Sequence, residues 1–128
     1  MNAEIGITVN IYPTEVDERI KKAILDIFPD ADINVGESVL TAKAKDLETL
    51  AEKLRDQRIR ATARSILRRC ASQSEIRFYL NKQAAFMGKV NFTEGESVLG
   101  DIEVSIHTEE PDTLIDSLTL VEKKEDLQ

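Results

Sequence analysis

The side chains able to do chemistry in this chain are mostly basic, and they gather in one segment. Between Lys53 and Lys89 stand ten basic residues and two acidic ones, Asp56 and Glu75, so the segment carries a charge of +8. The chain of 128 residues has a formal net charge of −7, which leaves −15 for everything outside the segment. A basic segment in an acidic protein can attract a polyanion locally, although the total charge repels it.

Part of this charge repeats with the period of a helix. Arg60, Arg64 and Arg68 follow one another at intervals of four residues, which places them on one ridge. Farther along, Arg77 and Tyr79 alternate with apolar residues and are expected on the polar face of a strand. Guanidinium groups beside an aromatic ring can neutralise phosphates and stack a base, so the pattern indicates nucleic-acid binding.

A second interpretation of the same arginines is structural. Exposed arginines on a helix commonly keep a protein soluble. Here they could also pair with the acids of residues 14–30 or of the C-terminal tail, because acidic side chains are in excess outside the segment.

Catalytic and metal-binding constellations are not found in the sequence. The chain has one histidine, His107, and one cysteine, Cys70, too few for a zinc site. Cys70 falls on an apolar helical stripe and is predicted to be an inert core thiol, while His107 is predicted on a solvated strand face. Five glycines form neither a phosphate loop nor a dinucleotide-binding motif. We therefore expect no enzyme, no metal and no cofactor.

The N-terminal half alternates strand and helix. Residues 5–12 alternate apolar and polar side chains and predict a strand, and a helix is expected from Thr14 to Phe28. Residues 33–44 form a second β region, in which Gly36 indicates either a bulge or a tight hairpin. A helix capped by Asp46 follows. Its apolar stripe slips near residues 55–58, which predicts a kink, a bulge or a break there.

The C-terminal half reads mainly as strands. Residues 76–81 and 86–92 are predicted to form a hairpin with its turn within 81–85, and a strand at 101–108 and a short helix after Pro111 follow. Every predicted strand has one apolar face, which indicates an α+β fold with a largely antiparallel sheet and helices packed on one face. We predict a single domain over residues 1–121 and a charged, frayed tail at 122–128.

One run of residues is familiar. The sequence Phe78-Tyr79-Leu80-Asn81-Lys82-Gln83-Ala84-Ala85-Phe86-Met87-Gly88-Lys89-Val90-Asn91-Phe92 resembles the signature of an archaeal uncharacterised protein family, number two-zero-one. Supporting matches are Ile11 to Glu15, Leu54 to Ile59, Thr62 to Arg64, and Leu99 to Val104. Together they span almost the whole chain in the expected order.

This resemblance implies an archaeal protein predicted to bind RNA, with a fold like ribosomal protein L-five and the double-stranded-RNA-binding domain. Its signature covers basic and amide side chains that the charge pattern also selects. The candidate RNA-binding residues are Arg58, Arg60, Arg64, Arg68, Arg77, Tyr79, Asn81, Lys82, Gln83 and Lys89. Asn81, Lys82 and Gln83 stand at a strand end, however, where the signature could instead be structural.

The alternative function is a protein-interaction module, either a homodimer or a subunit of a larger assembly. Residues 4–12 and 101–108 are taken as edge strands able to pair with another chain. The sequence contains no apolar stretch long enough to span a membrane and no signal-peptide pattern, and it has a single cysteine. These features favour a cytoplasmic protein.

Overall fold

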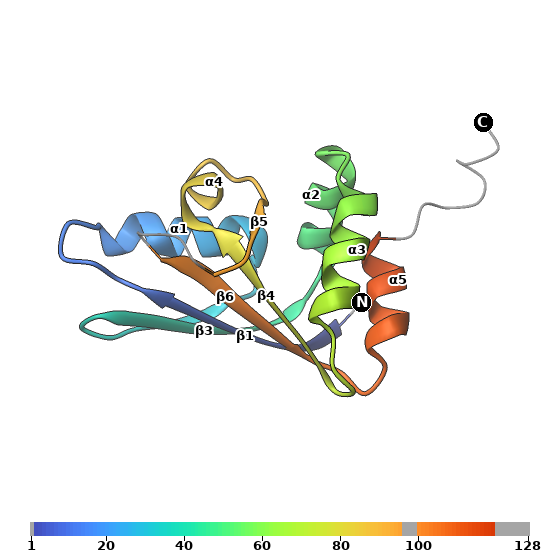
Figure 1. Ribbon diagram of the computed structural model, residues 1–128. Coiled ribbons are helices and arrows are strands. Elements are labelled where there is room, and N and C mark those ends of the chain that lie inside the picture. The colour runs from blue at the N-terminus through green and yellow to red at the C-terminus, as the bar shows by residue number, and fades with distance from the viewer. Residues whose placement is uncertain (1, 96–99, 120–128) are drawn as a thin grey trace.

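The computed structural model describes residues 2–95 and 100–119 and shows an α+β fold. Its six-stranded sheet has the order β2-β3-β1-β6-β4-β5, and every pair of neighbouring strands is antiparallel. All the described helices lie on one face of this sheet (Figure 1). The elements are β1 (Asn2–Asn10), α1 (Asp17–Ile27), β2 (Asp32–Val35), β3 (Val39–Asp46), α2 (Glu48–Asp56), α3 (Arg60–Cys70), β4 (Glu75–Asn81), α4 (Lys82–Phe86), β5 (Phe92–Thr93), β6 (Asp101–His107) and α5 (Pro111–Thr119).

The helices form two groups above the sheet. In one group α1 contacts α4, and in the other α3 packs against α5, with α2 contacting both of them (Figure 1). Apolar and polar residues alternate along every long strand, so each strand has one apolar face. That face is buried beneath the helices. The opposite face of the sheet is left open. The predicted fold class is confirmed.

The first strand lies in the interior of the sheet. β1 pairs with β3 on one side and with β6 on the other, and its apolar residues Ile5, Ile7 and Val9 are buried. The prediction that residues 4–12 and 101–108 are edge strands is therefore wrong. Alternation reports only which face of a strand is buried, so it cannot tell an edge strand from an interior one. Among the described strands, the edges are β2 and β5.

Gly36 belongs to a tight hairpin between β2 and β3, not to a bulge. Its N–H donates to the carbonyl of Val39 at 2.8 Å. A Cβ atom at this position would stand 2.9 Å from the same carbonyl oxygen, so the turn requires glycine.

The first helix begins at Asp17, three residues later than predicted. The carboxylate of Glu15 accepts the N–H of Tyr12 at 2.9 Å and holds the preceding turn instead.

The predicted helix irregularity is a complete break. After α2, the N–H of Arg58 donates to the carbonyl of Arg55, and the N–H of Ile59 donates to that of Leu54, both at 3.0 Å. This pair of bonds is a Schellman motif. Arg58 occupies its left-handed position with φ of 59°, and α3 starts two residues later.

The predicted hairpin at residues 76–92 is wrong, because most of its second strand is absent. The side chain of Asn81 accepts the N–H of Ala84 at 2.8 Å and starts the short helix α4. Only Phe92 and Thr93 pair with β4. The spacing of Phe86, Val90 and Phe92 resembles a strand, but the Asn81 cap starts a helical turn at that point.

Candidate nucleic-acid interface

The ten predicted RNA-binding residues do not form one surface. α3 lies on the helix-covered face of the sheet (Figure 1). Along β4, the buried residues Ile76, Phe78 and Leu80 point to that face. Arg77 and Tyr79, which alternate with them, therefore point to the open face. Arg77 and Tyr79, predicted to bind RNA together with the arginines of α3, thus lie on the opposite face of the sheet from them.

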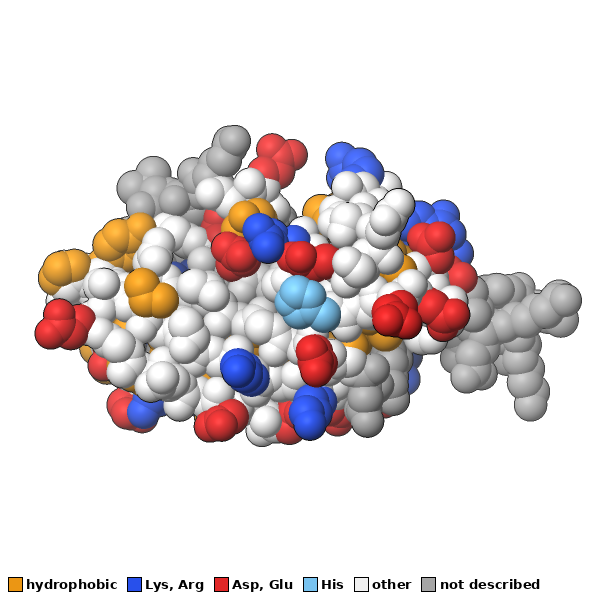
Figure 2. Space-filling model, turned by 90° about the horizontal axis from the view of Figure 1, so that it is seen from below, with side chains coloured by type: hydrophobic (Ala, Val, Ile, Leu, Met, Phe, Trp, Pro, Cys, Tyr) orange, Lys and Arg blue, Asp and Glu red, His pale blue; other side chains and the backbone are white. Residues whose placement is uncertain are grey.

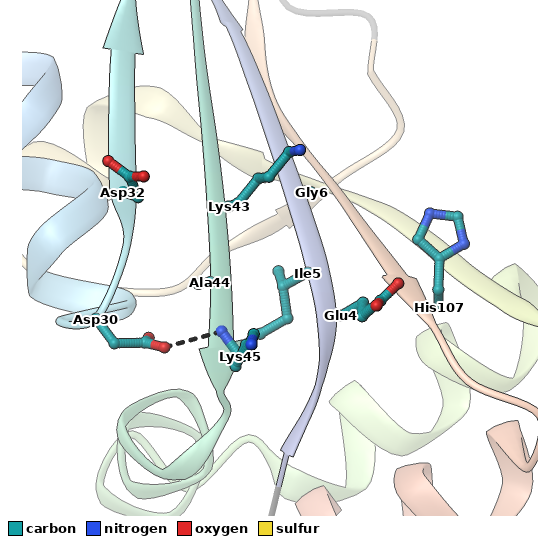
Figure 3. Close-up of a pocket in the computed structure, with 9 residues that line it drawn as sticks. All are labelled: Glu4, Ile5, Gly6, Asp30, Asp32, Lys43, Ala44, Lys45 and His107. Carbon is teal, nitrogen blue, oxygen red and sulfur yellow. Dashed lines mark hydrogen bonds between the residues drawn. The ribbon is translucent and has the colours of Figure 1, made fainter.

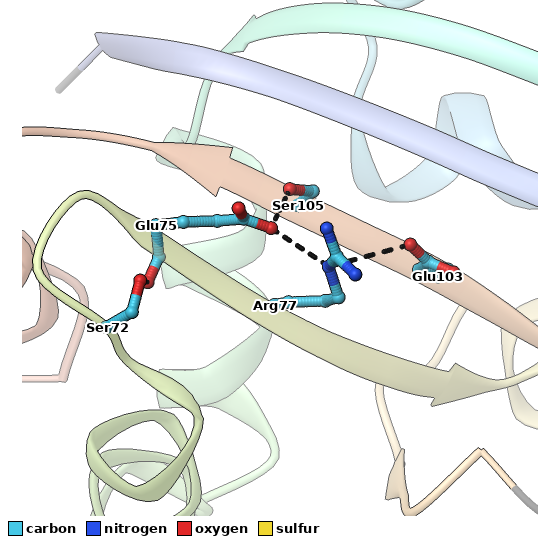
Figure 4. A network of polar contacts seen from close by, with 5 residues as sticks. All are labelled: Ser72, Glu75, Arg77, Glu103 and Ser105. Carbon is cyan, nitrogen blue, oxygen red and sulfur yellow. Dashed lines mark hydrogen bonds and ion pairs between the residues drawn. The ribbon is translucent and has the colours of Figure 1, made fainter.

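Arg77 forms ion pairs with two acidic side chains on the open face. Its Nε atom lies 2.9 Å from Glu75 Oε1 and 3.7 Å from Glu103 Oε1, and Ser105 Oγ donates to Glu75 Oε1 at 2.7 Å (Figure 4). The hydrogen bond from Ser105, followed by those from Arg77, lowers the pKa of Glu75. The pKa of Arg77 is raised by its bond to Glu75. The positive charge of Arg77 is thus balanced within the sheet.

Tyr79 is half-buried on the same open face. A Cβ atom added to Gly95 would stand 3.2 Å from two carbons of the Tyr79 ring, so the backbone there lies against the ring. Tyr79 faces away from the arginines of α3.

The predicted arginine ridge faces α5. Arg64 Nη2 lies 2.7 Å from Asp116 Oδ1, and Arg68 Nη2 lies 3.7 Å from the same oxygen. Arg60, the first residue of the ridge, is half-buried. The interpretation in which these arginines pair within the molecule is therefore correct for Arg64 and Arg68. Their partner belongs to α5, however, and not to residues 14–30.

The signature block is largely built into the structure. Lys82 is only 1% exposed, and its Nζ atom donates to the carbonyl of Asn10 at 2.8 Å and to Glu15 Oε1 at 3.0 Å. The same atom lies 5.2 Å from the centre of the Tyr12 ring. The prediction of Lys82 as a surface contact is wrong, because this ion pair fastens α4 to the turn after β1. Asn81 caps α4, and Gln83 is exposed.

Three exposed cations of the basic segment have no acidic partner among the described residues. Among residues 2–95 and 100–119, no carboxylate lies within ion-pairing distance of Arg58, Arg69 or Lys89. All three side chains are exposed. We call these three residues the basic rim.

The basic rim lies beside a hollow of about 400 Å³ between α3 and the segment that runs from α4 to β5. Lys89 lines this hollow, and Arg58 stands between two residues that line it, Gln57 and Ile59. Arg69 follows the lining residue Ile66 by three positions, on the same side of α3. On a helix with about 100° per residue, Arg64 lies about 160° away from Ile66, which separates the rim from the α5-facing ridge.

Gln57 holds the hollow together. Its side-chain nitrogen donates to the carbonyl of Val90, and its side-chain oxygen accepts the N–H of Val90, both at 2.8 Å. Lys53 adds a bond from its Nζ atom to the carbonyl of Gly88 at 2.6 Å. The last turn of α2 therefore anchors residues 88–90, which have no strand partner of their own.

Sequence reasoning missed the roles of Gln57, Asn91 and Phe92. Asn91 and Phe92 line the hollow, but the alternation pattern assigned them to a strand. Gln57 stands inside Leu54 to Ile59, one of the segments that support the family resemblance. That match was the one feature of the sequence that could have pointed to Gln57.

The open face of the sheet carries charges of both signs (Figure 2). It holds a hollow of about 560 Å³ lined by Glu4, Asp30, Lys45 and His107, among others (Figure 3). The carboxylate of Asp30 is already hydrogen-bonded there, because it accepts the N–H groups of Lys45 and Asp46 at 2.9 and 3.2 Å. His107 lies exposed on this face, as predicted. The mixed charge gives this face no preference for a polyanion.

The remaining candidates for chemistry are few in the described part of the chain. No group of three or more His, Cys, Asp or Glu side chains is placed there to hold a metal ion. Cys70 is half-buried; burial raises the pKa of its thiol, which Arg69 lowers to a smaller extent. A thiol with a raised pKa stays protonated at neutral pH and is a weak nucleophile.

The chain matches a protein-family model described as RNA binding over residues 4–108. It is 41% identical over 119 residues to a UPF0201 protein of Thermococcus kodakarensis, covering 88% of this chain and 86% of the relative. It is also 41% identical over 105 residues to a UPF0200/UPF0201 protein of Archaeoglobus fulgidus, covering 81% of this chain. The chain spans only about a third, 32%, of that longer relative.

Solved structures support the fold. A UPF0201 protein from Methanococcus jannaschii is 35% identical, covers 91% of this chain and 98% of its own, and superimposes with a TM-score of 0.80.

The expected likeness to ribosomal protein L-five and to the double-stranded-RNA-binding domain stays a prediction. So do the non-enzymatic nature of the chain and its cytoplasmic location. No helix among the described residues is long and apolar enough to cross a membrane. The predicted tail at 122–128 lies outside the described residues.

Proposed function

Since this chain belongs to the UPF0201 family, we propose that it is a non-catalytic RNA-binding domain that contacts backbone phosphates through its basic rim. The family model that matches most of the chain is described as RNA binding. The proposal replaces the ten predicted residues by a smaller set at one place, Arg58, Arg69 and Lys89.

The observation that supports this proposal is that, among the described residues, the basic rim has no acidic partner. Cations that already pair with carboxylates must break those pairs to bind phosphate. Arg64 and Arg77 are in this position, with carboxylate oxygens 2.7 and 2.9 Å away. Arg58, Arg69 and Lys89 are exposed and have no such pair to break within residues 2–95 and 100–119. Their charge is therefore available to a polyanion even though the protein as a whole is acidic.

A binding titration with fluorescent RNA at several salt concentrations tests the proposal. Each neutralised phosphate on a single strand contributes about −0.7 to the slope of log K against log salt. Three contacts therefore predict a slope of about −2. Replacing all three rim residues, as Arg58→Gln/Arg69→Gln/Lys89→Gln, should remove most of the binding and flatten the slope.

The matched control removes the same charge elsewhere. Lys21→Gln/Lys43→Gln/Lys45→Gln changes one lysine of α1 and two exposed lysines of β3, none of which lines the hollow. It should bind RNA nearly as well as the unchanged protein. Equal losses in both triple variants would mean that only net charge matters, and affinity independent of salt would contradict phosphate contacts altogether.

The structure gives less support to the alternative of a protein-interaction module. The exposed edge strand β2 has four residues and begins with Asp32. Short edges with charged side chains are features that discourage strand pairing between chains. Assembly through a homodimer or a larger complex stays a prediction.

A further inference from the structure

We infer that the hollow beside the basic rim receives one unpaired nucleobase of the bound RNA. This inference rests on the proposed function and adds to it the structural class of RNA, one with a base outside a continuous duplex. It gives the rim and the hollow separate tasks, holding phosphates and accepting a base.

The floor of the hollow is apolar and partly open to solvent. Ile59 just before α3, Ile66 of α3 and Phe92 of β5 line it and are half-buried. The Phe92 ring packs against the buried ring of Phe78, with ring centres 5.6 Å apart and planes tilted by 55°. A ring held in this way is a platform on which a base can stack, whatever its sequence.

The walls offer hydrogen-bonding groups beside this floor. Thr62 and Asn91 are exposed lining residues. Within the described part of the chain, neither side chain makes a hydrogen bond. An amide can donate and accept at the edge of a base, and a hydroxyl can do either. Gln57 is excluded from this task, because both of its polar atoms hold Val90.

The size and order of the hollow favour a single small group. Its volume of about 400 Å³ lies toward the lower end of the range of roughly 300–1,000 Å³ typical of small-ligand sites. The bonds from Gln57 and Lys53 fix its wall before any ligand arrives. A preformed site loses less entropy on binding.

A base within an RNA helix cannot reach this floor. Both of its faces are stacked on neighbours, and the helix presents mainly phosphates and 2′-hydroxyls to a protein. Only a base in a single strand, loop or bulge has a face free to cover Phe92. The exposed cations of the rim would then hold the phosphates on either side of it.

Two RNA duplexes, each annealed from two separate strands, test the inference and differ by one nucleotide. One is blunt-ended and fully paired, and the other carries a single-nucleotide bulge at its centre. The bulged duplex should bind the full chain about tenfold more tightly in an anisotropy titration, the order expected for stacking of one base. Thr62→Phe, which places a large side chain in the hollow from an exposed helix position, should remove this preference and leave binding of the paired duplex unchanged.

Ala61→Phe is the matched control. It adds the same side chain to the neighbouring exposed position, which lies about 140° around α3 from Ile66. This variant should keep the preference for the bulge, and thermal unfolding should show that both variants fold.

The outcomes separate the inference from the proposed function. Equal affinity for the two duplexes, or a preference that persists in Thr62→Phe, overturns the base site while leaving RNA binding in place. Binding of neither duplex at low salt overturns the proposed function and the base site together.

Discussion

Arg58 adopts a backbone conformation that most side chains avoid. Its φ of 59° lies in the left-handed region, and the Schellman motif at the end of α2 imposes it. Glycine is the usual residue at this position because it has no Cβ atom to clash. An arginine there lowers stability slightly, which fits a residue retained for a contact with another molecule.

Replacing Arg58 by glycine should therefore separate stability from binding. Arg58→Gly is expected to raise the free energy of unfolding by about 0.5–1 kcal/mol, because the strain disappears. The same change should weaken RNA binding, because a rim cation is lost. Urea unfolding and an RNA titration on one preparation check both. Arg58→Lys should keep both the strain and the binding, and a glycine variant that is less stable would contradict this account.

The carboxylate of Glu75 predicts a local response to pH. Its hydrogen bond from Ser105, followed by those from Arg77, lowers its pKa below the ordinary value of 4.5. A carboxylate with a lowered pKa in the folded state stabilises the fold above pH 4.5, and this contribution is lost as the pH falls through the folded-state pKa. Ser105→Ala should shift the pKa of Glu75 back toward 4.5.

A carboxyl-carbon NMR titration measures that shift directly. Ser117→Ala is the control, since the Ser117 hydroxyl bonds the carbonyl of Thr113 within α5, away from Glu75. An unchanged pKa of Glu75 in Ser105→Ala would show that the hydroxyl is not the main cause.

At the level of elements, α4 is attached to the start of the chain by a buried ion pair. Lys82 is buried, and the Glu15 side chain that it contacts is 12% exposed. Removing one partner of a buried pair leaves a charge without compensation and costs about 3–5 kcal/mol. Lys82→Met should therefore destabilise the protein by about that amount, as measured by urea unfolding.

The double variant Lys82→Met/Glu15→Gln should recover much of this loss, because no uncompensated charge remains. The amide oxygen of Gln can still accept the N–H of Tyr12. A loss in Lys82→Met that the second change does not reduce would mean that packing, and not charge, holds α4.

The segment between α4 and β5 is held at Val90 by the side chain of Gln57, the C-cap residue of α2. Gln57→Ala removes both bonds to the backbone of Val90 and should cost about 1–2 kcal/mol. Amide hydrogen exchange at Val90 should accelerate more than exchange in β1. Gln83→Ala, at an exposed position of α4, is the control and should leave both measurements unchanged.

The success of sequence reasoning differed between these elements for a physical reason. Features that follow from the local spacing of apolar residues, such as the strand β1 and the break between α2 and α3, could be predicted. The short helix α4 could not, because its start depends on the Asn81 cap and its position on the contact of Lys82 with the distant residue Glu15. The basic segment was found from composition, but which cations pair with acids depends on tertiary contacts such as Arg64 with Asp116.

At the scale of the molecule, charge and chemistry are divided between the two sides of one sheet. The open face mixes acids and bases (Figure 2), while the rim and its hollow lie on the helix-covered side. An overall charge of −7 repels RNA at long range. Recognition is therefore expected to depend on the short-range fit of the rim, with slower association than for a uniformly basic domain.

The interior position of β1 has a consequence for how the chain is made. Glu4 of β1 pairs with His107 of β6, and such distant pairings are slow to form. A ribosome delivers β1, α1 and the β2–β3 hairpin by residue 46, well before β6 is complete at residue 107. During that interval the nascent chain presents β1 as an unpaired edge bearing Ile5, Ile7 and Val9. A strand that lies in the interior of the finished sheet is thus open to misassociation during synthesis.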